Sequence, residues 1–175
     1  KSFIIKIIVL CLVTIKVSAI EKVILFGDSL MAGYGLPNEQ HLSVVLQNSL
    51  EVEGHNIEII NGSVSGSTSA GGLNIAEWTL SENNIDLMIL CLGANDMLRG
   101  INPKETKNNL EEIIKIAKNK NIKIIIAGMI APTSYGSKYK ESFDKIFFNL
   151  SKEYNLQLIP FLLEGVAQKP EFNLS

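Results

Sequence analysis

The chain has 175 residues, of which 46% are hydrophobic, and its formal net charge is −2. This length and apolar content suffice for one domain with a full core and give no reason to expect two. The small net charge argues against the strongly basic surface of a nucleic-acid-binding protein.

Residues 1–19 differ from the rest of the chain. Lys1 and Lys6 precede an apolar segment, residues 7–15, which is followed by Val17-Ser18-Ala19. A basic start, a short apolar segment and small residues at positions −3 and −1 before a cleavage site after Ala19 predict a secretory signal peptide. The alternative is an uncleaved anchor or a buried strand. The segment is too short to span a bilayer comfortably. We therefore expect a periplasmic or secreted protein whose domain covers residues 20–175, without a stable membrane span after cleavage.

Beyond residue 20, short apolar runs alternate with segments of helical spacing. The runs that predict strands are 22–26, 57–60, 87–92, 122–127 and 156–161. Apolar positions that share a helical face are Leu42, Val45, Leu46 and Leu50; Leu110, Ile113, Ile114 and Ala117; and Phe143, Ile146, Phe147 and Leu150. The sequence Asn102-Pro103-Lys104-Glu105 predicts a helix start, with a capping Asn and Pro at the first position. Alternating strands and helices predict one α/β domain with a parallel sheet.

In such sheets ligands bind at the carboxyl ends of the strands, so the loops after the strands are the places to search for function. The first of them is Gly27-Asp28-Ser29-Leu30. Its serine is either a nucleophile or a turn residue, and this tetrapeptide alone favours the turn. The phosphate-loop and G-x-G-x-x-G patterns are both absent from the chain. So is the G-x-S-x-G pattern of α/β-hydrolases.

Two further loops carry small or amide-bearing residues. Residues 61–72 are rich in Gly and Ser, so their backbone N–H groups are open to a ligand, and the following 73–80 predict a helix whose amino end favours an anion. The loop 93–100 places Asn95 directly after a buried strand. An Asn amide is a neutral donor, suited to an oxygen that becomes negative during a reaction. A flexible loop and an Asx-turn are the structural alternatives.

The order of these blocks resembles the SGNH, or GDSL, hydrolase family. The stretches that carry the resemblance are "GDSLMAGYGLP", "NGSVSGSTSAGGL", "LGANDMLRG", "APTSYGSKYKESF" and "IPFLLEGVAQKPEF", which together cover roughly residues 21–173. They look like the bacterial arylesterase subgroup, which includes multifunctional thioesterase, protease and lysophospholipase enzymes. The resemblance implies a three-layer α/β/α fold, with a five-stranded parallel sheet in flavodoxin-like order.

The resemblance also implies roles for individual residues. Ser29 would be the nucleophile, and its own N–H, the Gly66 N–H and the Asn95 side chain would form the oxyanion hole. Asp28 would brace the turn, and we expect Arg99 to hold the third loop by an ion pair, a contact with an anionic headgroup being the alternative. The segment 129–137 resembles the wall of the family's acyl site.

In that wall, Ala131 and Pro132 are the residues that we expect to contact the acyl chain. Relatives often carry a larger apolar residue where this chain has Ala131, so bulkier acyl groups would fit. Cys91, which lies in an apolar run, is expected to be a small core residue rather than a reactive thiol.

The family pattern stops before its last block, D-x-x-H, which supplies the general base and the Asp that orients it. No D-x-x-H occurs in the sequence, which ends at Ser175 shortly after the block that should precede it. We expect the printed chain to lack its catalytic Asp/His pair and final helix, and to be inactive or severely impaired as it stands. The histidines, His41 and His55, are not expected to substitute: one begins a helix, and the other precedes a strand at the wrong edge of the sheet.

Three functions remain to be weighed. The first is a monomeric serine esterase that hydrolyses small carboxylic esters, lysophospholipids or acyl thioesters through an acyl-enzyme on Ser29, without metal or organic cofactor. Export would argue against acyl-CoA as the natural substrate. The second is a non-catalytic acyl- or ester-binding pseudoenzyme that keeps the pocket without the base. The third, a nucleotide-binding flavodoxin-like module, ranks far behind because a phosphate loop is lacking.

Overall fold

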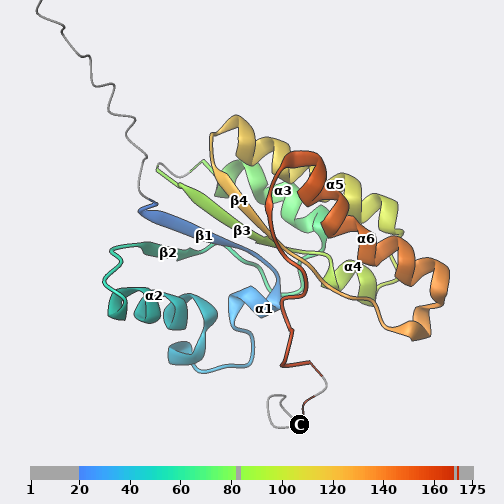
Figure 1. The fold of residues 1–175 in the computed structure, drawn as a ribbon, viewed down its shortest axis with the longest axis horizontal. Helices are drawn as coiled ribbons and strands as arrows, with labels where there is room; N and C mark the ends of the chain where they lie inside the picture. Colours follow the sequence, from blue (N-terminus) through green and yellow to red (C-terminus); the bar gives the residue numbers. More distant parts are fainter. Residues whose placement is uncertain (1–19, 82–83, 168, 170–175) are drawn as a thin grey trace, which may run out of the picture.

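Five parallel strands form the centre of the protein and run between layers of helices (Figure 1). The computed structural model describes residues 20–81, 84–167 and 169. The strands are β1 (Lys22–Gly27), β2 (Glu58–Asn61), β3 (Leu87–Cys91), β4 (Lys123–Ala127) and β5 (Gln157–Ile159). Their order across the sheet is β2-β1-β3-β4-β5, with all neighbours parallel. The predicted α/β class and flavodoxin-like order are confirmed.

The central strands are apolar runs because most of their side chains are buried, as is typical of a parallel sheet. Residues 23–27 of β1 are all buried. β1 and β3 run in register, with Phe26 opposite Leu90 and Gly27 opposite Cys91. The two strands therefore end at the same level, and the loops that follow them meet at one edge of the sheet.

Three long helices cover one face of the sheet: α3 (Ser69–Thr79), α5 (Pro103–Asn119) and α6 (Ser137–Tyr154) (Figure 1). The predicted helix start at residue 102 is confirmed, because the Asn102 side chain accepts a hydrogen bond from the Lys104 N–H and Pro103 is the first helical residue. Short elements connect the rest: α1 (Ser29–Ala32), η1 (Asn38–Gln40), α4 (Ala94–Leu98) and η2 (Thr133–Tyr135).

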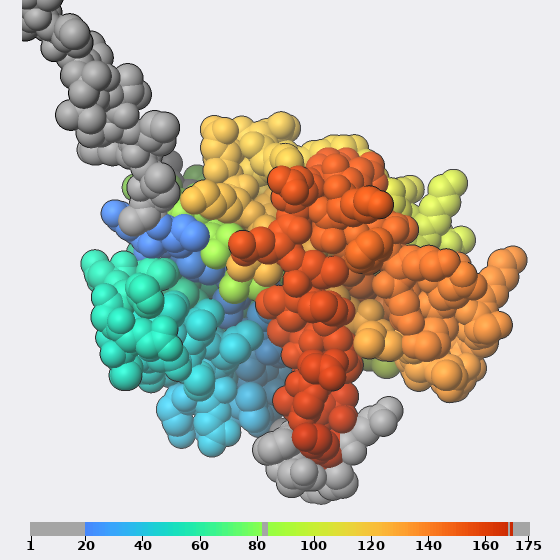
Figure 2. Space-filling model, viewed as in Figure 1, coloured from blue at the N-terminus to red at the C-terminus, as the bar shows by residue number. Residues whose placement is uncertain are grey.

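The opposite face carries α2 (Leu42–Val52), which lies beside β2 (Figure 1). Leu42 and Leu46 pack against the core, but Val45 is 47% exposed and α2 contains no fully buried residue. The apolar face predicted for this helix is therefore only partly covered. The β3 residues Leu87 and Ile89 are half-buried, and sheet atoms are visible in Figure 2 between α2 and the β5 segment.

Helix α3 begins earlier than the sequence indicated. The helix was expected from residue 73, but it starts at Ser69, because the Thr68 side chain caps it by accepting a hydrogen bond from the Gly71 N–H. Gly72 lets the helix approach the sheet closely, since a Cβ there would stand 2.3 Å from Leu92 Cδ1. The second loop is therefore shorter than predicted, and its end is a helix amino terminus.

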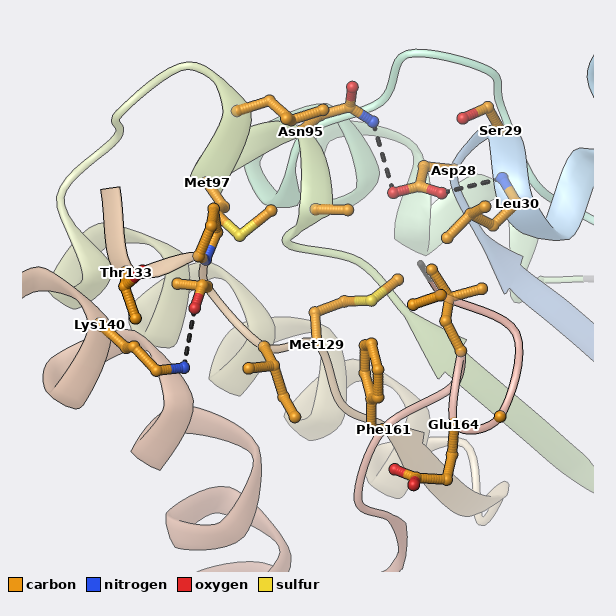
Figure 3. A pocket seen from close by; sticks show the side chains of 18 residues that line it. Asp28, Ser29, Leu30, Asn95, Met97, Met129, Thr133, Lys140, Phe161 and Glu164 are labelled. Atoms are coloured by element: carbon orange, nitrogen blue, oxygen red, sulfur yellow. Dashed lines mark hydrogen bonds between the residues drawn. The ribbon is translucent and has the colours of Figure 1, made fainter. Parts of the chain in front are cut away.

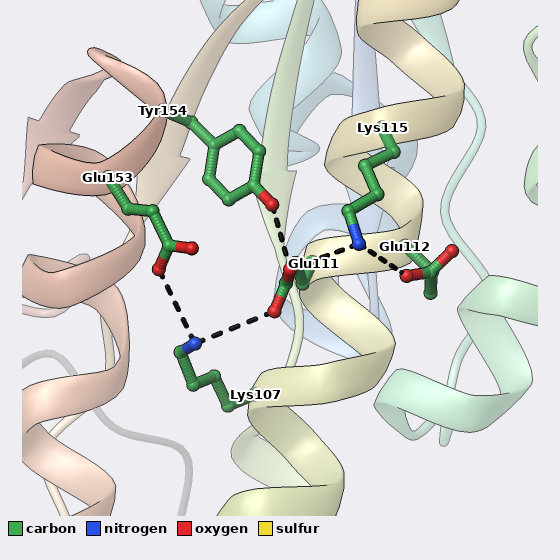
Figure 4. A network of polar contacts seen from close by, with 6 residues as sticks. All are labelled: Lys107, Glu111, Glu112, Lys115, Glu153 and Tyr154. Carbon is green, nitrogen blue, oxygen red and sulfur yellow. Dashed lines mark hydrogen bonds and ion pairs between the residues drawn. The ribbon is translucent and has the colours of Figure 1, made fainter.

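A polar network fastens α6 to α5 (Figure 4). The Tyr154 hydroxyl of α6 donates to Glu111 of α5 at 2.8 Å, and Lys107 bridges Glu111 and Glu153 at 3.5 and 3.4 Å. The Tyr154 and Lys115 hydrogen bonds lower the pKa of Glu111 from 4.5 to about 2. The carboxylate is thus favoured in the folded protein, and it holds the end of α6 in place.

Two further predictions concern the core and the membrane. Cys91 is completely buried, and this burial raises the pKa of its thiol, which confirms its role as a core residue. Within the described residues, no helix has the length and apolarity needed to cross a bilayer. The predicted signal peptide, residues 1–19, lies outside the described residues.

Candidate active site

Ser29 is the first residue of α1, immediately after β1. The preceding residue, Asp28, is buried and caps this helix, because its Oδ1 accepts a hydrogen bond from the Leu30 N–H at 3.1 Å. The expectation that Asp28 braces the turn is confirmed. Gly27 brings the turn against β3, since a Cβ there would lie 2.7 Å from the Cys91 carbonyl oxygen. The Ser29 hydroxyl has no hydrogen-bond partner among the described residues.

Two backbone N–H groups near this turn are also without acceptors among the described residues, those of Ser29 and Gly66. Gly66 has φ of +78°, a left-handed conformation that only glycine adopts without strain. N–H groups without an acceptor can donate hydrogen bonds to an oxyanion. Gly66 lies in the second loop and is not among the residues that line the cavity described below.

Asn95, on α4, carries the third candidate donor. Its Nδ2 donates to the Ser67 carbonyl oxygen at 3.0 Å and to Asp28 Oδ2 at 3.3 Å. In Figure 3 the Asn95 amide points toward Asp28, and Ser29 lies on the same side of that carboxylate. The side chain therefore joins the first, second and third loops. To serve an oxyanion it must exchange one of these bonds, and the longer one, to Asp28, is the weaker of the two.

The Asp28 carboxyl is electrostatically unusual. Burial raises its pKa, and this effect outweighs the hydrogen bonds from Leu30 and Asn95, which lower it. Asp96 adds a like charge that raises the pKa further. A carboxyl group in such surroundings holds its proton more firmly than an exposed one, so its bond to Asn95 depends on its protonation state.

Arg99 holds the second loop rather than forming an ion pair. Its Nη2 donates to the Gly66 carbonyl oxygen at 3.0 Å, and no ion pair involves it among the described residues. The predicted ion pair is therefore wrong. The physical reason is that the guanidinium reaches a backbone carbonyl of a neighbouring loop, and this carbonyl accepts a charge-assisted hydrogen bond.

A residue that the sequence reasoning missed, Asp96, organises these loops. It is fully buried and accepts hydrogen bonds from the Ser69 N–H at 2.7 Å, the Ser69 hydroxyl at 2.5 Å and the Thr106 hydroxyl at 3.2 Å. The anion predicted at the amino end of α3 is thus this internal carboxylate. An acidic residue placed between Asn95 and an apolar residue, just after a buried strand, was the available signal.

A cavity of about 710 Å³ opens beside Ser29 (Figure 3). Asp28, Ser29 and Asn95 line one end, and Ala131 and Pro132, the residues predicted to contact an acyl chain, are also in the lining. Most of the remaining wall is apolar and comes from α4, the segment after β4 and the segment after β5: Met97, Leu98, Met129, Ile130, Phe161 and Leu163. A cavity with apolar walls and a few polar groups at one end suits a ligand with an apolar tail and a polar head.

Neither histidine lies at this cavity. His41 precedes α2, packs its ring against Gly33 and lies 3.1 Å from the Leu36 carbonyl oxygen through Nε2. His55 is exposed in the turn before β2, 4.0 Å from Glu53. Among the described residues, no cluster of three or more His, Cys, Asp or Glu side chains is arranged to hold a metal ion.

Comparisons with known proteins show which family the chain resembles. The model of the GDSL-like Lipase/Acylhydrolase family matches residues 25–174. An arylesterase of Vibrio mimicus is 38% identical over 154 residues, which cover 88% of this chain and 77% of the relative. The thioesterase 1/protease 1/lysophospholipase L1 of Escherichia coli strain K12 is 31% identical over 163 residues, 93% of this chain and 77% of the relative.

Among solved structures, the SGNH-hydrolase family esterase AlinE4 superposes with a TM-score of 0.86 at 38% identity. The match covers 90% of this chain and 84% of that structure.

Proposed function

The chain belongs to the GDSL-like lipase/acylhydrolase family, and from this membership we propose that it is a serine esterase that hydrolyses carboxylic esters through an acyl-enzyme on Ser29. One observation supports this most directly. An uncommitted Ser29 hydroxyl stands at the head of an apolar cavity, in the same turn as an N–H without an acceptor. Such a site suits attack on an ester carbonyl, with the acyl group in the cavity.

The reaction would proceed in two steps. Ser29 Oγ attacks the ester carbonyl carbon, and the carbonyl oxygen becomes an oxyanion that the N–H groups of Ser29 and Gly66 and the Asn95 amide stabilise. The carbon–oxygen bond to the alcohol then breaks, the alcohol leaves with a proton, and an acyl-Ser29 ester remains. Water hydrolyses this ester by the same route and releases the acid.

The proton of Ser29 needs an acceptor, and neither His41 nor His55 is placed to take it. A serine without a base is a weak nucleophile at neutral pH. Binding and an oxyanion hole alone retain about 10³–10⁴-fold catalysis over water in serine proteases that have lost a triad member.

No histidine lies among the described residues that line this cavity. The alternative function to be tested is therefore a non-catalytic protein that binds acyl or ester ligands in the same cavity. The two functions differ in turnover. An esterase releases acid and alcohol from a bound ester, whereas a binder holds the ester unchanged.

The substrates that we propose are esters with an apolar acyl group, including aryl esters, lysophospholipids and acyl thioesters. The apolar walls of the cavity support the acyl part of this assignment. The names of the relatives, an arylesterase and a thioesterase/lysophospholipase, support the range of leaving groups. We also propose export to the periplasm or medium. Fractionation and amino-terminal sequencing of the mature protein would test this, with cytoplasmic retention as the contrary result.

A fluorophosphonate probe tests the nucleophile. The protein expressed from its gene should be labelled on Ser29, and Ser29→Ala should abolish both labelling and hydrolysis of p-nitrophenyl butyrate. Ser142→Ala is the control, because Ser142 is exposed on α6 and its hydroxyl is bonded to the Lys138 carbonyl. Labelling that persists in Ser29→Ala would refute the assignment. Fatty-acid binding without labelling or turnover would support the binder instead.

A further inference from the structure

The wall of the cavity opposite Ser29 is a segment without regular secondary structure. It follows β4 and runs from Met129 to Pro132, and all of its residues line the cavity. Ala131 is only 1% exposed, whereas its neighbour Ile130 is 45% exposed. Among the described residues, Ala131 makes the only backbone hydrogen bonds of residues 129–131. The next residue of the wall, Pro132, accepts a longer hydrogen bond from the Tyr135 N–H, at 3.4 Å. Among the described residues, the bonds of Ala131 are therefore the main polar anchors of this wall.

Two side chains of α6 hold both polar groups of the Ala131 backbone. The Ala131 N–H donates to Asp144 Oδ1 at 2.8 Å, and the Ala131 carbonyl oxygen accepts from Lys140 Nζ at 2.8 Å. Lys140 and Asp144 are themselves paired at 2.7 Å. They stand one helical turn apart on the same face, so the three bonds close a ring. Bonds to charged groups are the stronger class of hydrogen bond.

The helix that carries this pair is firmly placed. Phe143, between Lys140 and Asp144 in the chain, is fully buried and stacks on Tyr139 with ring centroids 6.0 Å apart. The Tyr139 hydroxyl donates to the Ile101 carbonyl oxygen at 2.9 Å, and the far end of α6 is tied to α5 through Glu111 (Figure 4). The Lys140–Asp144 pair therefore fixes the cavity wall relative to a helix that is itself held in place.

Lys140 and Ser29 lie at opposite ends of the cavity (Figure 3). An acyl group bound at Ser29 therefore extends further toward Lys140 the longer its chain is. The charge of Lys140 is balanced by Asp144 there, so an apolar tail does not meet an unpaired ammonium group.

We propose that Lys140 and Asp144 are specificity-determining positioning residues, which fix the Ala131 wall and thereby allow the cavity to accept long acyl chains. This inference rests on the proposed esterase function. It adds that the far end of the cavity selects substrates by the length of their acyl chain. In a variant, each methylene group of the acyl chain that is no longer bound at the Lys140 end of the cavity should lower kcat/KM about fourfold. Effects on short esters should be small.

The variants Lys140→Met and Asp144→Asn test the proposal. Met keeps the stem of Lys without its charge, and Asn retains an oxygen for the Ala131 N–H. The control is Lys145→Met, which breaks the exposed pair with Glu141 on the same helix at the same spacing. Thermal unfolding of all three variants reports whether each one is folded.

The measurement is kcat/KM for p-nitrophenyl esters from acetate to laurate, together with the rate of fluorophosphonate labelling. Both pair variants should lower the laurate-to-acetate ratio tenfold or more, whereas Lys145→Met, which lies outside the cavity, should keep the ratio and the labelling rate of wild type. An unchanged ratio in folded variants, an equal loss for all chain lengths, or the same shift in Lys145→Met would overturn the proposal.

Failure of the esterase assignment would appear separately, as a wild-type protein that neither labels nor turns over. The pair is then tested by affinity for fatty acids of the same lengths, measured by calorimetry. Loss of affinity confined to long chains supports the proposal, and uniform affinities in wild type and variants refute it.

Discussion

The Asn95 side-chain nitrogen lies 3.3 Å from the buried Asp28 carboxylate, in the turn that carries Ser29. Asn95 therefore reaches the first loop from the third, and its second bond, to the Ser67 carbonyl, reaches the second loop. One amide group joins the ends of three chain segments. A donor held in this way loses little freedom when an oxyanion replaces one of its acceptors, which is the physical basis of preorganised electrostatic stabilisation.

Replacement of Asn95 by Ala should lower kcat for short esters by about 10²–10³-fold, because one oxyanion donor is lost. KM should change little, since the ground-state ester does not carry the charge. Steady-state kinetics with p-nitrophenyl acetate measure this. A loss confined to KM would contradict the assigned role.

Replacement of Arg99 by Met should reduce the labelling rate at Ser29 by several-fold, because the Gly66 carbonyl loses the bond that orients its loop. Arg99→Lys should recover part of the rate, since an ammonium group also donates to a carbonyl. Equal rates in wild type and Arg99→Met would show that the Gly66 loop holds its position without this bond.

Replacement of Asp96 by Ala should destabilise the fold by about 3 kcal/mol, because it leaves the buried Ser69 donors without an acceptor. Thr106→Val removes one of the Asp96 bonds and should cost about 1 kcal/mol. Urea unfolding measures both. The control is Asp86→Asn at the other end of the sheet, where the carboxylate accepts from the exposed Glu21 N–H and the part-buried Lys22 N–H. A larger loss in this control than in Asp96→Ala would refute the ranking.

Stability should fall between about pH 4.5 and about pH 2 through Glu111. Its folded pKa, about 2, is below its ordinary value of 4.5, so its contribution is complete above pH 4.5 and disappears as the pH falls through the folded pKa. Glu111→Gln should lose less stability than wild type across this range. Chemical unfolding at a series of pH values measures the difference, and parallel curves would contradict the prediction.

Neither histidine should supply the general base. His41→Gln and His55→Gln should therefore leave the acid limb of the pH–rate profile for ester hydrolysis within about 0.3 pH units of wild type. His41 contacts Gly33, so its variant also needs a check of thermal stability. Loss of the acid limb in either variant would assign that histidine as the base.

The sequence by itself determined the fold class, the strand positions and the family. Strands β1 and β3 are recognisable because the inner strands of a parallel sheet are apolar along their length. The helix start at Asn102 is equally local, since a cap involves residues two or three positions apart. The nucleophile and oxyanion candidates followed from a resemblance carried by short blocks.

Only the tertiary structure decided which groups meet. The bonds of Asp96 to Ser69, of Arg99 to Gly66 and of Ala131 to Asp144 join residues 27, 33 and 13 positions apart. No local pattern marks such pairs, because a polar side chain satisfies its hydrogen bonds with whatever group the packing of strands and helices brings near it. The early start of α3 has both a local and a distant cause: Thr68 caps the helix, and the buried Asp96 carboxylate of another loop accepts the Ser69 N–H.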